Sequence, residues 1–223
     1  MIKAHKTTAA ASQPRLTQAE RRQQSEHGLL VAAAEVVLEH GYTGATFDRI
    51  SERAGYSRGL VTLRFGSKDG LVAAMIEFLG AQLEDIYRQR LETARSGREK
   101  LIDFVDVFMV RLDEDRLTRA YFVLLAGALG NLLPQARYFL AQHEKVKQLL
   151  ADLIREGMAD GTIAADIAPE DAALALGCFQ LGVAIQHQLD PAMPLAAMRS
   201  FVRRFAGDGG AGDAGAGEGD ALR

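Results

Sequence analysis

The sequence predicts an all-α protein of nine helices. Apolar residues recur three and four residues apart over most of the region 26–206, which is the spacing of one helix face. Gly, Ser, Thr and Pro interrupt this pattern where helices would start and stop. No long run of alternating β-branched residues occurs, and no Asn-Gly turn joins two such runs, so strands are not indicated.

The first four predicted helices are short to medium and are bounded by recognisable caps. The first spans residues 26–40 and ends at Gly41. Thr46 and Ser57 are predicted N-caps, because their side chains can accept a hydrogen bond from the first helical turn. The four helices are expected at residues 26–40, 47–54, 58–65 and 68–93.

Five further helices are expected, most of them longer. Three prolines stand at or near their starts, where a missing N–H does no harm: Pro134, Pro169 and Pro194. The five helices are expected at residues 98–114, 117–131, 135–160, 169–189 and 194–206.

The two ends of the chain show no helical pattern. Residues 1–24 carry five Lys/Arg against one acid and are expected to form a flexible basic arm. Residues 207–223 are rich in glycine and cannot bury apolar surface, so a disordered tail is expected there.

Composition is that of an ordinary soluble protein: 223 residues, 48% hydrophobic, 25% charged, with a net charge of −3. That balance excludes a wholly basic nucleic-acid coat protein. Residues 1–70 nevertheless carry a net charge of +3 and residues 71–223 one of −6, which favours an anionic partner for the N-terminal part.

Location is expected to be cytoplasmic, with no membrane partner. No apolar run approaches the roughly 20 residues of a membrane span. The N-terminus lacks the apolar core, about 7–15 residues long, of a secretory signal. A single cysteine, Cys178, excludes an internal disulfide and any multi-cysteine zinc site.

Residues 46–65, TFDRISERAGYSRGLVTLRF, are the most informative part of the chain. Two short helices separated by Gly55-Tyr56-Ser57 form a helix-turn-helix pattern. Ile50 and Ala54 can pack against Val61 and Phe65, which leaves an outer face on the second helix. That face carries Arg58, Gly59, Thr62, Leu63 and Arg64.

A helix with such a face can enter the major groove of DNA and reach base edges. Thr46, Ser57 and Lys68 lie at helix N-termini, where exposed N–H groups favour phosphate. The alternative is a helical hairpin inside an ordinary bundle, and the pattern alone leaves it open.

The region from Leu30 to Met75 resembles the DNA-binding domain of the tetracycline-repressor-like (TetR) family of bacterial transcriptional regulators. The family pattern of Gly-x-x-x-x-Thr, Ile-Ala-x-x-Ala-Gly-x-Ser-x-Gly, Phe and Ser-Lys-x-x-Leu is matched at fixed spacing. The matching segments begin at Gly41, Ile50, Phe65 and Ser67. Two departures occur: Ser51 replaces the usual Ala, and Thr62 replaces a tyrosine that touches the DNA backbone.

The resemblance implies a ligand-responsive transcriptional regulator, which is expected to be a repressor. It would bind a palindromic operator in double-stranded DNA as a homodimer. A small, largely apolar effector would release it from the DNA. It implies a DNA-binding domain at residues 25–70 and a ligand-binding and dimerisation domain at 71–206. The DNA-binding residues are expected to be Thr46, Ser57, Arg58, Gly59, Thr62, Leu63, Arg64 and Lys68.

Aromatic and other adaptable apolar residues supply material for a pocket in the later helices. Simple core packing is the alternative for each of them. Tyr121, His143 and Gln180 are the polar candidates. The expected pocket residues are Phe104, Phe108, Tyr121, Phe122, Leu125, His143, Cys178 and Phe179, with Cys178 expected to be buried.

The last two predicted helices are expected to form the dimer interface, with packing inside one subunit as the alternative. Small residues along 169–189 permit close approach of a second helix. Residues 194–206 carry an apolar seam at 3-4-3 spacing, typical of a coiled coil, formed by Leu195, Met198, Val202 and Phe205.

Catalytic and cofactor chemistry has no supporting motif, so no enzyme, metal or cofactor is expected. The five histidines lack zinc-site spacing, there is no Gly-x-Ser-x-Gly elbow, and the glycine-rich tail lacks the Gly-Lys-Ser/Thr ending of a phosphate loop. The remaining alternative function is a helical small-molecule or lipid-binding protein whose N-terminal motif is purely structural.

Overall fold

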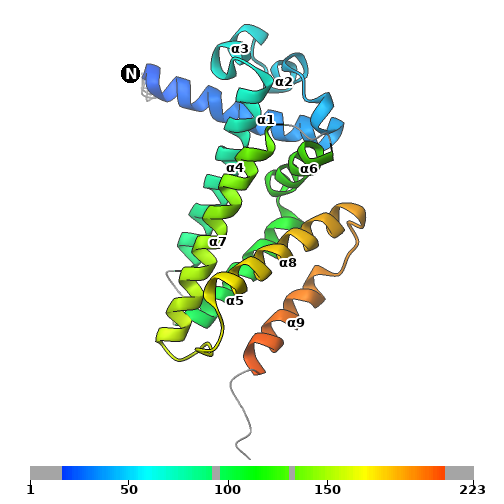
Figure 1. Ribbon diagram of the computed structural model, residues 1–223. Helices are drawn as coiled ribbons and strands as arrows, with labels where there is room; N and C mark the ends of the chain where they lie inside the picture. The colour runs from blue at the N-terminus through cyan, green and yellow to red at the C-terminus, as the bar shows by residue number, and fades with distance from the viewer. Residues whose placement is uncertain (1–16, 92–95, 131–133, 209–223) are drawn as a thin grey trace, which may run out of the picture.

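The computed structural model describes residues 17–91, 96–130 and 134–208. These residues form nine α-helices and no strand, which confirms the all-α prediction (Figure 1). The helices are α1 Gln18–Gly44, α2 Phe47–Ala54, α3 Arg58–Phe65, α4 Lys68–Leu91, α5 Gly97–Glu114, α6 Arg116–Gly130, α7 Ala136–Ala159, α8 Pro169–Leu189 and α9 Leu195–Asp208.

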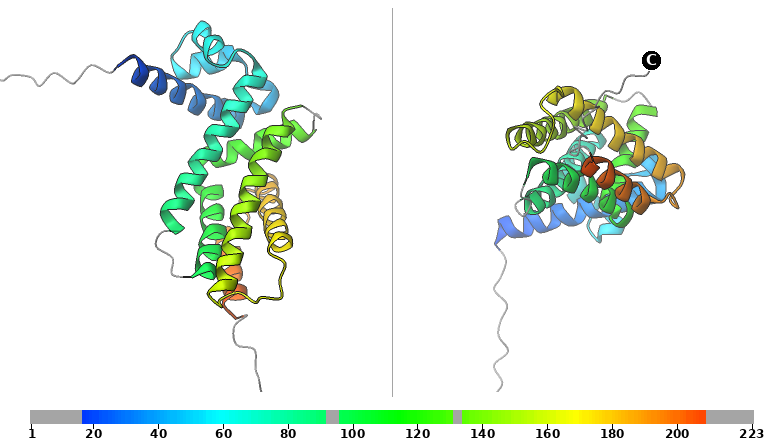
Figure 2. Two further views of the ribbon diagram at one scale, coloured as in Figure 1. Left: turned by 60° about the vertical axis from the view of Figure 1, so that its left-hand side comes forward. Right: turned by 90° about the horizontal axis from the view of Figure 1, so that it is seen from below.

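Helices α1 to α3 gather at one end of the molecule, and α5, α8 and α9 lie toward the other (Figure 1). Helix α4 starts beside α3 and runs down into the second group (Figure 2). Its 24 residues span about 36 Å at 1.5 Å per residue. One helix therefore belongs to both ends of the molecule.

The apolar core is continuous across the two ends. One cluster of buried side chains runs from Leu29 of α1 and Ile50 of α2 to Leu124 of α6 and Leu195 of α9. A second cluster, around Phe104 and Leu150, fills the space between α5 and α7. Burial of such side chains contributes about 1.5–3 kcal/mol each to folding.

The predicted bounds of the first and last helices are wrong. Helix α1 begins at Gln18, so residues 18–24 are helical and not part of a flexible arm. The cause is a capping box: the Thr17 hydroxyl accepts from the Glu20 N–H at 3.2 Å, and the Glu20 carboxylate accepts from the Thr17 N–H at 2.7 Å. At the other end, α9 continues to Asp208. The remainder of the expected arm and tail lies outside the described residues.

Helix α9 is fastened to α5 by a cluster of charged side chains. The carboxylate of Asp106, buried in α5, accepts from Arg199 at 2.6 and 2.8 Å and from Arg203 at 2.8 Å. Burial raises the pKa of Asp106, but hydrogen bonds from Arg199 and Arg203 outweigh burial and hold that pKa below its usual value.

Replacing Asp106 with asparagine is expected to lower the free energy of unfolding by about 1–3 kcal/mol at pH 7, because two partly exposed guanidinium groups lose the negative charge and one of the two acceptor oxygens of their partner. Since the folded-state pKa is depressed, this stabilisation is present above the unfolded pKa and is lost as pH falls through the folded pKa. The free energies of unfolding of the two proteins, measured in urea, should therefore differ at pH 7 and converge only as the pH falls below the depressed folded-state pKa of Asp106. Asp103→Asn, on the same helix outside this cluster, is the control; equal effects of the two substitutions would contradict the assignment.

Candidate nucleic-acid interface and cavity

Helices α2 and α3 form the predicted helix-turn-helix, with the predicted caps. The Thr46 hydroxyl accepts from the Arg49 N–H at 3.4 Å, and the Ser57 hydroxyl accepts from the Leu60 N–H at 3.2 Å. Gly55 ends α2 with a φ of 70°, a left-handed conformation that favours glycine. Local side chains therefore set both the length of each helix and the turn between them.

The inner and outer faces of α3 differ sharply in burial. Val61 and Phe65 are buried in the core with Ile50 of α2. On the opposite face Gly59 and Thr62 are exposed, and Leu63 is 77% exposed. The sequence-predicted face thus lies on the molecular surface.

The two arginines of α3 are placed differently. Arg58 is exposed, and its Nη1 donates to both carboxylate oxygens of Asp48 at 2.8 Å. Such a surface pair costs little to exchange for another anion. Arg64 is half-buried and turns toward α1, where its Nη2 donates to the Ser25 hydroxyl at 3.3 Å. The expectation that Arg64 extends from the outer face is therefore wrong in this conformation.

Lys68 lies at the start of α4, as predicted. Its side chain contacts Tyr42 and Thr43, two residues that the sequence did not indicate as its partners. Its Nζ donates to the Thr43 carbonyl at 3.3 Å and lies 4.5 Å from the ring centroid of Tyr42. Partial burial lowers the pKa of Lys68. The C-terminal end of α1 thus holds this ammonium group close to the helix-turn-helix.

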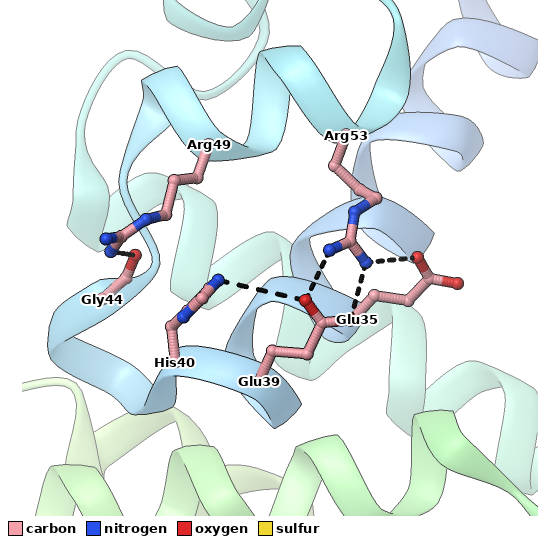
Figure 3. A network of polar contacts seen from close by, with 6 residues as sticks. All are labelled: Glu35, Glu39, His40, Gly44, Arg49 and Arg53. Atoms are coloured by element: carbon pink, nitrogen blue, oxygen red, sulfur yellow. Dashed lines mark hydrogen bonds and ion pairs between the residues drawn. The ribbon is translucent and has the colours of Figure 1, made fainter.

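An ion-pair network orients α2 on α1 (Figure 3). Arg53 of α2 donates to Glu35 at 3.1 Å and also to Glu39, both on α1. Arg49, one turn earlier on α2, donates to the Gly44 carbonyl at 2.9 Å. These contacts hold α2 in a fixed orientation on α1.

Contacts from the later helices reach the same region. Gly127 of α6 packs so closely on Tyr42 that a Cβ there would lie 2.6 Å from the Tyr42 Cβ. Tyr138 of α7 donates to the Asp69 carboxylate at 3.0 Å, next to Lys68. Helices α6 and α7 therefore contact Tyr42 and the start of α4 directly.

A cavity of about 280 Å³ lies among α4, α5, α6, α7 and α8. Six of the eight predicted pocket residues line it: Phe104, Phe108, Tyr121, Phe122, His143 and Cys178. The other two do not. Leu125 is buried in the core, and Phe179 packs against that core from α8. Tyr87 and Leu140 line the cavity and were missed, because only tertiary packing brings α4 and the exposed side of α7 to it.

Cys178 lies at the surface, contrary to the expectation that it is buried. A second cavity of about 540 Å³ adjoins the first, with Tyr87, Phe104, Gln142 and Val146 lining both. Charged side chains of α4, α5 and α7 surround this second space, and among them Arg88 is paired with Glu84 and Asp85.

Three residues of the predicted dimer seam of α9, Leu195, Met198 and Val202, face the core of their own subunit, which is the alternative packing that the sequence left open. Leu195 is 4% exposed in the core of its own subunit, and Met198 and Val202 pack against that core. The 3-4-3 spacing marks an apolar stripe but does not say which surface covers it. The side chain of Phe205 lies outside the described residues.

Helix α8 carries an exposed stripe of small and apolar residues. Successive turns expose Leu174, Ala175, Cys178, Gly182 and Leu189. By length and composition α8 is the one helix in the described part of the chain that could cross a membrane. Its opposite side, however, buries Gln180 and His187 against the bundle. The exposed stripe is apolar surface that needs a cover.

The described residues contain no group of three or more His, Cys, Asp or Glu side chains that could hold a metal ion.

Comparison with known proteins matches the N-terminal region to a family model described as bacterial regulatory proteins, tetR family, over residues 29–75. An HTH-type transcriptional activator, FasR, of Mycolicibacterium smegmatis is 36% identical over 45% of this chain and 44% of its own length. An HTH-type transcriptional repressor, KstR2, of the same organism is 28% identical over 62% of this chain and 67% of its own length. The chain thus spans less than half of the first of these relatives.

Solved structures share the fold over most of the chain. The fatty acid degradation regulator FadR of Bacillus halodurans has a TM-score of 0.73 at 21% identity, covering 82% of this chain and 98% of that one. FadR of Bacillus subtilis in complex with stearoyl-CoA has a TM-score of 0.71 at 18% identity, covering 82% and 98% respectively. The architecture described above is therefore that of these regulators.

Proposed function

We propose that this chain is a transcriptional repressor controlled by a small effector, because residues 29–75 match the family model of bacterial regulatory proteins, tetR family, and a repressor is among its relatives. In this proposal it binds a palindromic operator as a homodimer in the cytoplasm. Residues 25–70 form the DNA-binding part and residues 71–206 the effector-binding and dimerisation part. Its relatives are regulators and not enzymes.

The observation that carries the proposal is the exposed outer face of α3, which no other described helix covers. A purely structural hairpin, as in a lipid-binding bundle, would cover the apolar side chain that this face presents. Instead Leu63 is 77% exposed, beside Gly59 and Thr62. An exposed helix with small side chains and a flanking cation, Lys68, suits the major groove and its bordering phosphates.

The exposed stripe of α8 supports the homodimer. A second copy of the chain, related by a two-fold axis, would cover the stripe with the same stripe. Small residues such as Ala175 and Gly182 permit close approach of the two helices. The dimer would then present two α3 helices to half-sites about 34–36 Å apart on one duplex face.

Repression is supported by the relative that matches the larger share of the chain, which is a repressor. Control by an effector is supported by the path from the cavity to the DNA-binding part. Helix α6 lines the cavity with Tyr121 and Phe122 and also carries Gly127 against Tyr42. An effector that shifts α6 would move Tyr42, which contacts Lys68, and would thereby change the affinity for DNA.

Fluorescence anisotropy with the labelled duplex from upstream of the protein's own gene tests the proposal. We expect binding that weakens steeply with salt, because phosphate neutralisation releases counterions. A duplex of unrelated sequence should bind more weakly. Absence of binding to either duplex at low salt would contradict the proposal and favour a helical small-molecule or lipid-binding protein.

Replacing Lys68 with alanine is expected to weaken binding to both duplexes alike and to lower the salt slope by roughly 1 for each subunit that contacts the duplex. The reason is the loss of one phosphate contact per subunit. The measurement is the same anisotropy titration at a series of salt concentrations. Arg204→Ala, at an exposed position of α9 outside both cavities, is the control; an unchanged slope for the Lys68 variant would remove Lys68 from the interface.

A further inference from the structure

Two deeply buried polar side chains face the smaller cavity without a partner. Tyr121 of α6 is 3% exposed and Gln180 of α8 is 5% exposed. The Tyr121 Oη and the Gln180 Nε2 have no hydrogen-bond partner among the described residues. Buried polar groups in folded proteins are nearly always hydrogen-bonded, so two unpaired groups lining one cavity indicate that a ligand completes them.

The remainder of the cavity wall is largely apolar and aromatic. Phe108 and Phe122 pack edge-to-face beside Tyr121. The two formally charged residues that line the cavity, Glu144 and Lys147, are paired with each other at 2.6 Å. The wall therefore offers hydrogen bonds but no unpaired charge.

Two further side chains of the wall, His143 and Tyr121, have pKa values that favour their neutral forms near pH 7. Burial lowers the pKa of His143, whose ring lies 6.1 Å from that of Tyr121, and so disfavours the imidazolium form. Burial raises the pKa of Tyr121, which keeps its hydroxyl protonated and able to donate. A ligand carboxylate would lose its hydration here without gaining a cation.

We propose that the cavity binds a small, mainly apolar effector through one uncharged carbonyl group, which accepts hydrogen bonds from Tyr121 and Gln180. Ketones, esters and amides carry such a group. Free carboxylic acids and amines are disfavoured. This inference rests on the proposed function, because it assigns the chemical class of the effector.

The size of the cavity limits the apolar part of that effector. Its volume of about 280 Å³ lies at the lower end of pockets for drug-sized ligands, which run from about 300 Å³ upward. The stacked rings of Tyr87 and Phe104, with centroids 3.9 Å apart, line both this cavity and the larger one beside it. A body of one ring with a short chain fits a volume of this size.

Calorimetry of the full chain without DNA tests the inference with three probes of matched shape. Benzylacetone carries the ketone, butylbenzene lacks a polar group, and hydrocinnamate carries a carboxylate. We expect the ketone to bind about tenfold tighter than the carboxylate. The ketone should also bind about fivefold tighter than the hydrocarbon for each hydrogen bond formed.

Two substitutions remove the donors with little change of volume, Tyr121→Phe and Gln180→Leu. Each should weaken benzylacetone binding about fivefold and leave butylbenzene binding unchanged within twofold. Both variants should fold, since the Tyr121 Oη and the Gln180 Nε2 that they remove have no partner among the described residues and the replacements are of similar volume; circular dichroism melting checks this. Tyr56→Phe, which removes a hydroxyl in the turn before α3, should leave the affinity for all three probes unchanged.

The inference is overturned if hydrocinnamate binds as tightly as benzylacetone, if the two variants bind the ketone like the wild type, or if none of the probes binds. These outcomes are independent of the proposed function, because no DNA is present in the measurement. Conversely, if the chain fails to bind any duplex but shows the expected selectivity, the cavity assignment stands and the regulator assignment falls.

Discussion

Replacing Leu63 with aspartate is expected to weaken duplex binding about 100-fold. The side chain is 77% exposed at the centre of the outer face of α3, so its replacement should not change the melting temperature. A carboxylate there meets phosphates, and a unit charge pair about 4 Å apart is worth about 1–4 kcal/mol between bulk water and a protein surface. Because each of the two subunits on one duplex carries the substitution, the loss of binding free energy occurs twice. Anisotropy and a thermal melt measure the two expectations.

Leu63→Lys is the matched control, because it also removes the apolar side chain but adds the opposite charge. Its binding to unrelated duplexes should be equal to or tighter than that of the wild type, while its preference for the operator falls. If the aspartate variant binds like the wild type, α3 does not face DNA. If both variants lose binding equally, the apolar contact of Leu63 and not the charge decides affinity.

The elements that could be predicted from the sequence are those defined by local interactions. The bounds 47–54 and 58–65 agree with α2 and α3, because Thr46, Ser57 and Gly55 act on the turn beside them. The same kind of signal marks the start of α1. There the Thr17–Glu20 capping box was overlooked in favour of the polar composition of residues 1–24.

Features that depend on distant parts of the chain could not be predicted in the same way. Arg64 turns away from the outer face because of Ser25, 39 residues earlier. The apolar stripe of α9 faces inward, and Arg199 on the same helix pairs with Asp106 of α5, which lies 93 residues earlier in the chain. A helical period identifies an apolar stripe, but only tertiary packing decides what lies against it.

The cavity contains both residues that the sequence predicted correctly and residues that it did not. Aromatic content on the predicted helices was enough to identify Phe104, Phe108, Tyr121 and Phe122 as lining residues. It was not enough to exclude Leu125, one helical turn from Tyr121, which points into the core. Neighbouring positions on one helix separate into core and cavity according to the angle at which α6 crosses its partners, and that angle is not encoded locally.

Ala175→Arg is expected to break the proposed homodimer. Ala175 lies on the exposed stripe of α8, where close approach of a second α8 leaves no room for a guanidinium group and where symmetry would place two like charges together. We expect the dissociation constant of the dimer to rise at least about 100-fold, equivalent to about 2.7 kcal/mol. Operator binding should fall with it, because a monomer contacts a single half-site.

Analytical ultracentrifugation measures the state of assembly, with Ala141→Arg as the matched control. Ala141 is equally an exposed helical alanine, on α7 and outside the stripe, so the same substitution there should leave the dimer intact. A variant at Ala175 that sediments as the wild-type dimer would show that the stripe is not the interface. In that case something other than a second α8 would cover the exposed apolar surface. Because α8 is long and apolar enough to cross a membrane, flotation with lipid vesicles would be the next test.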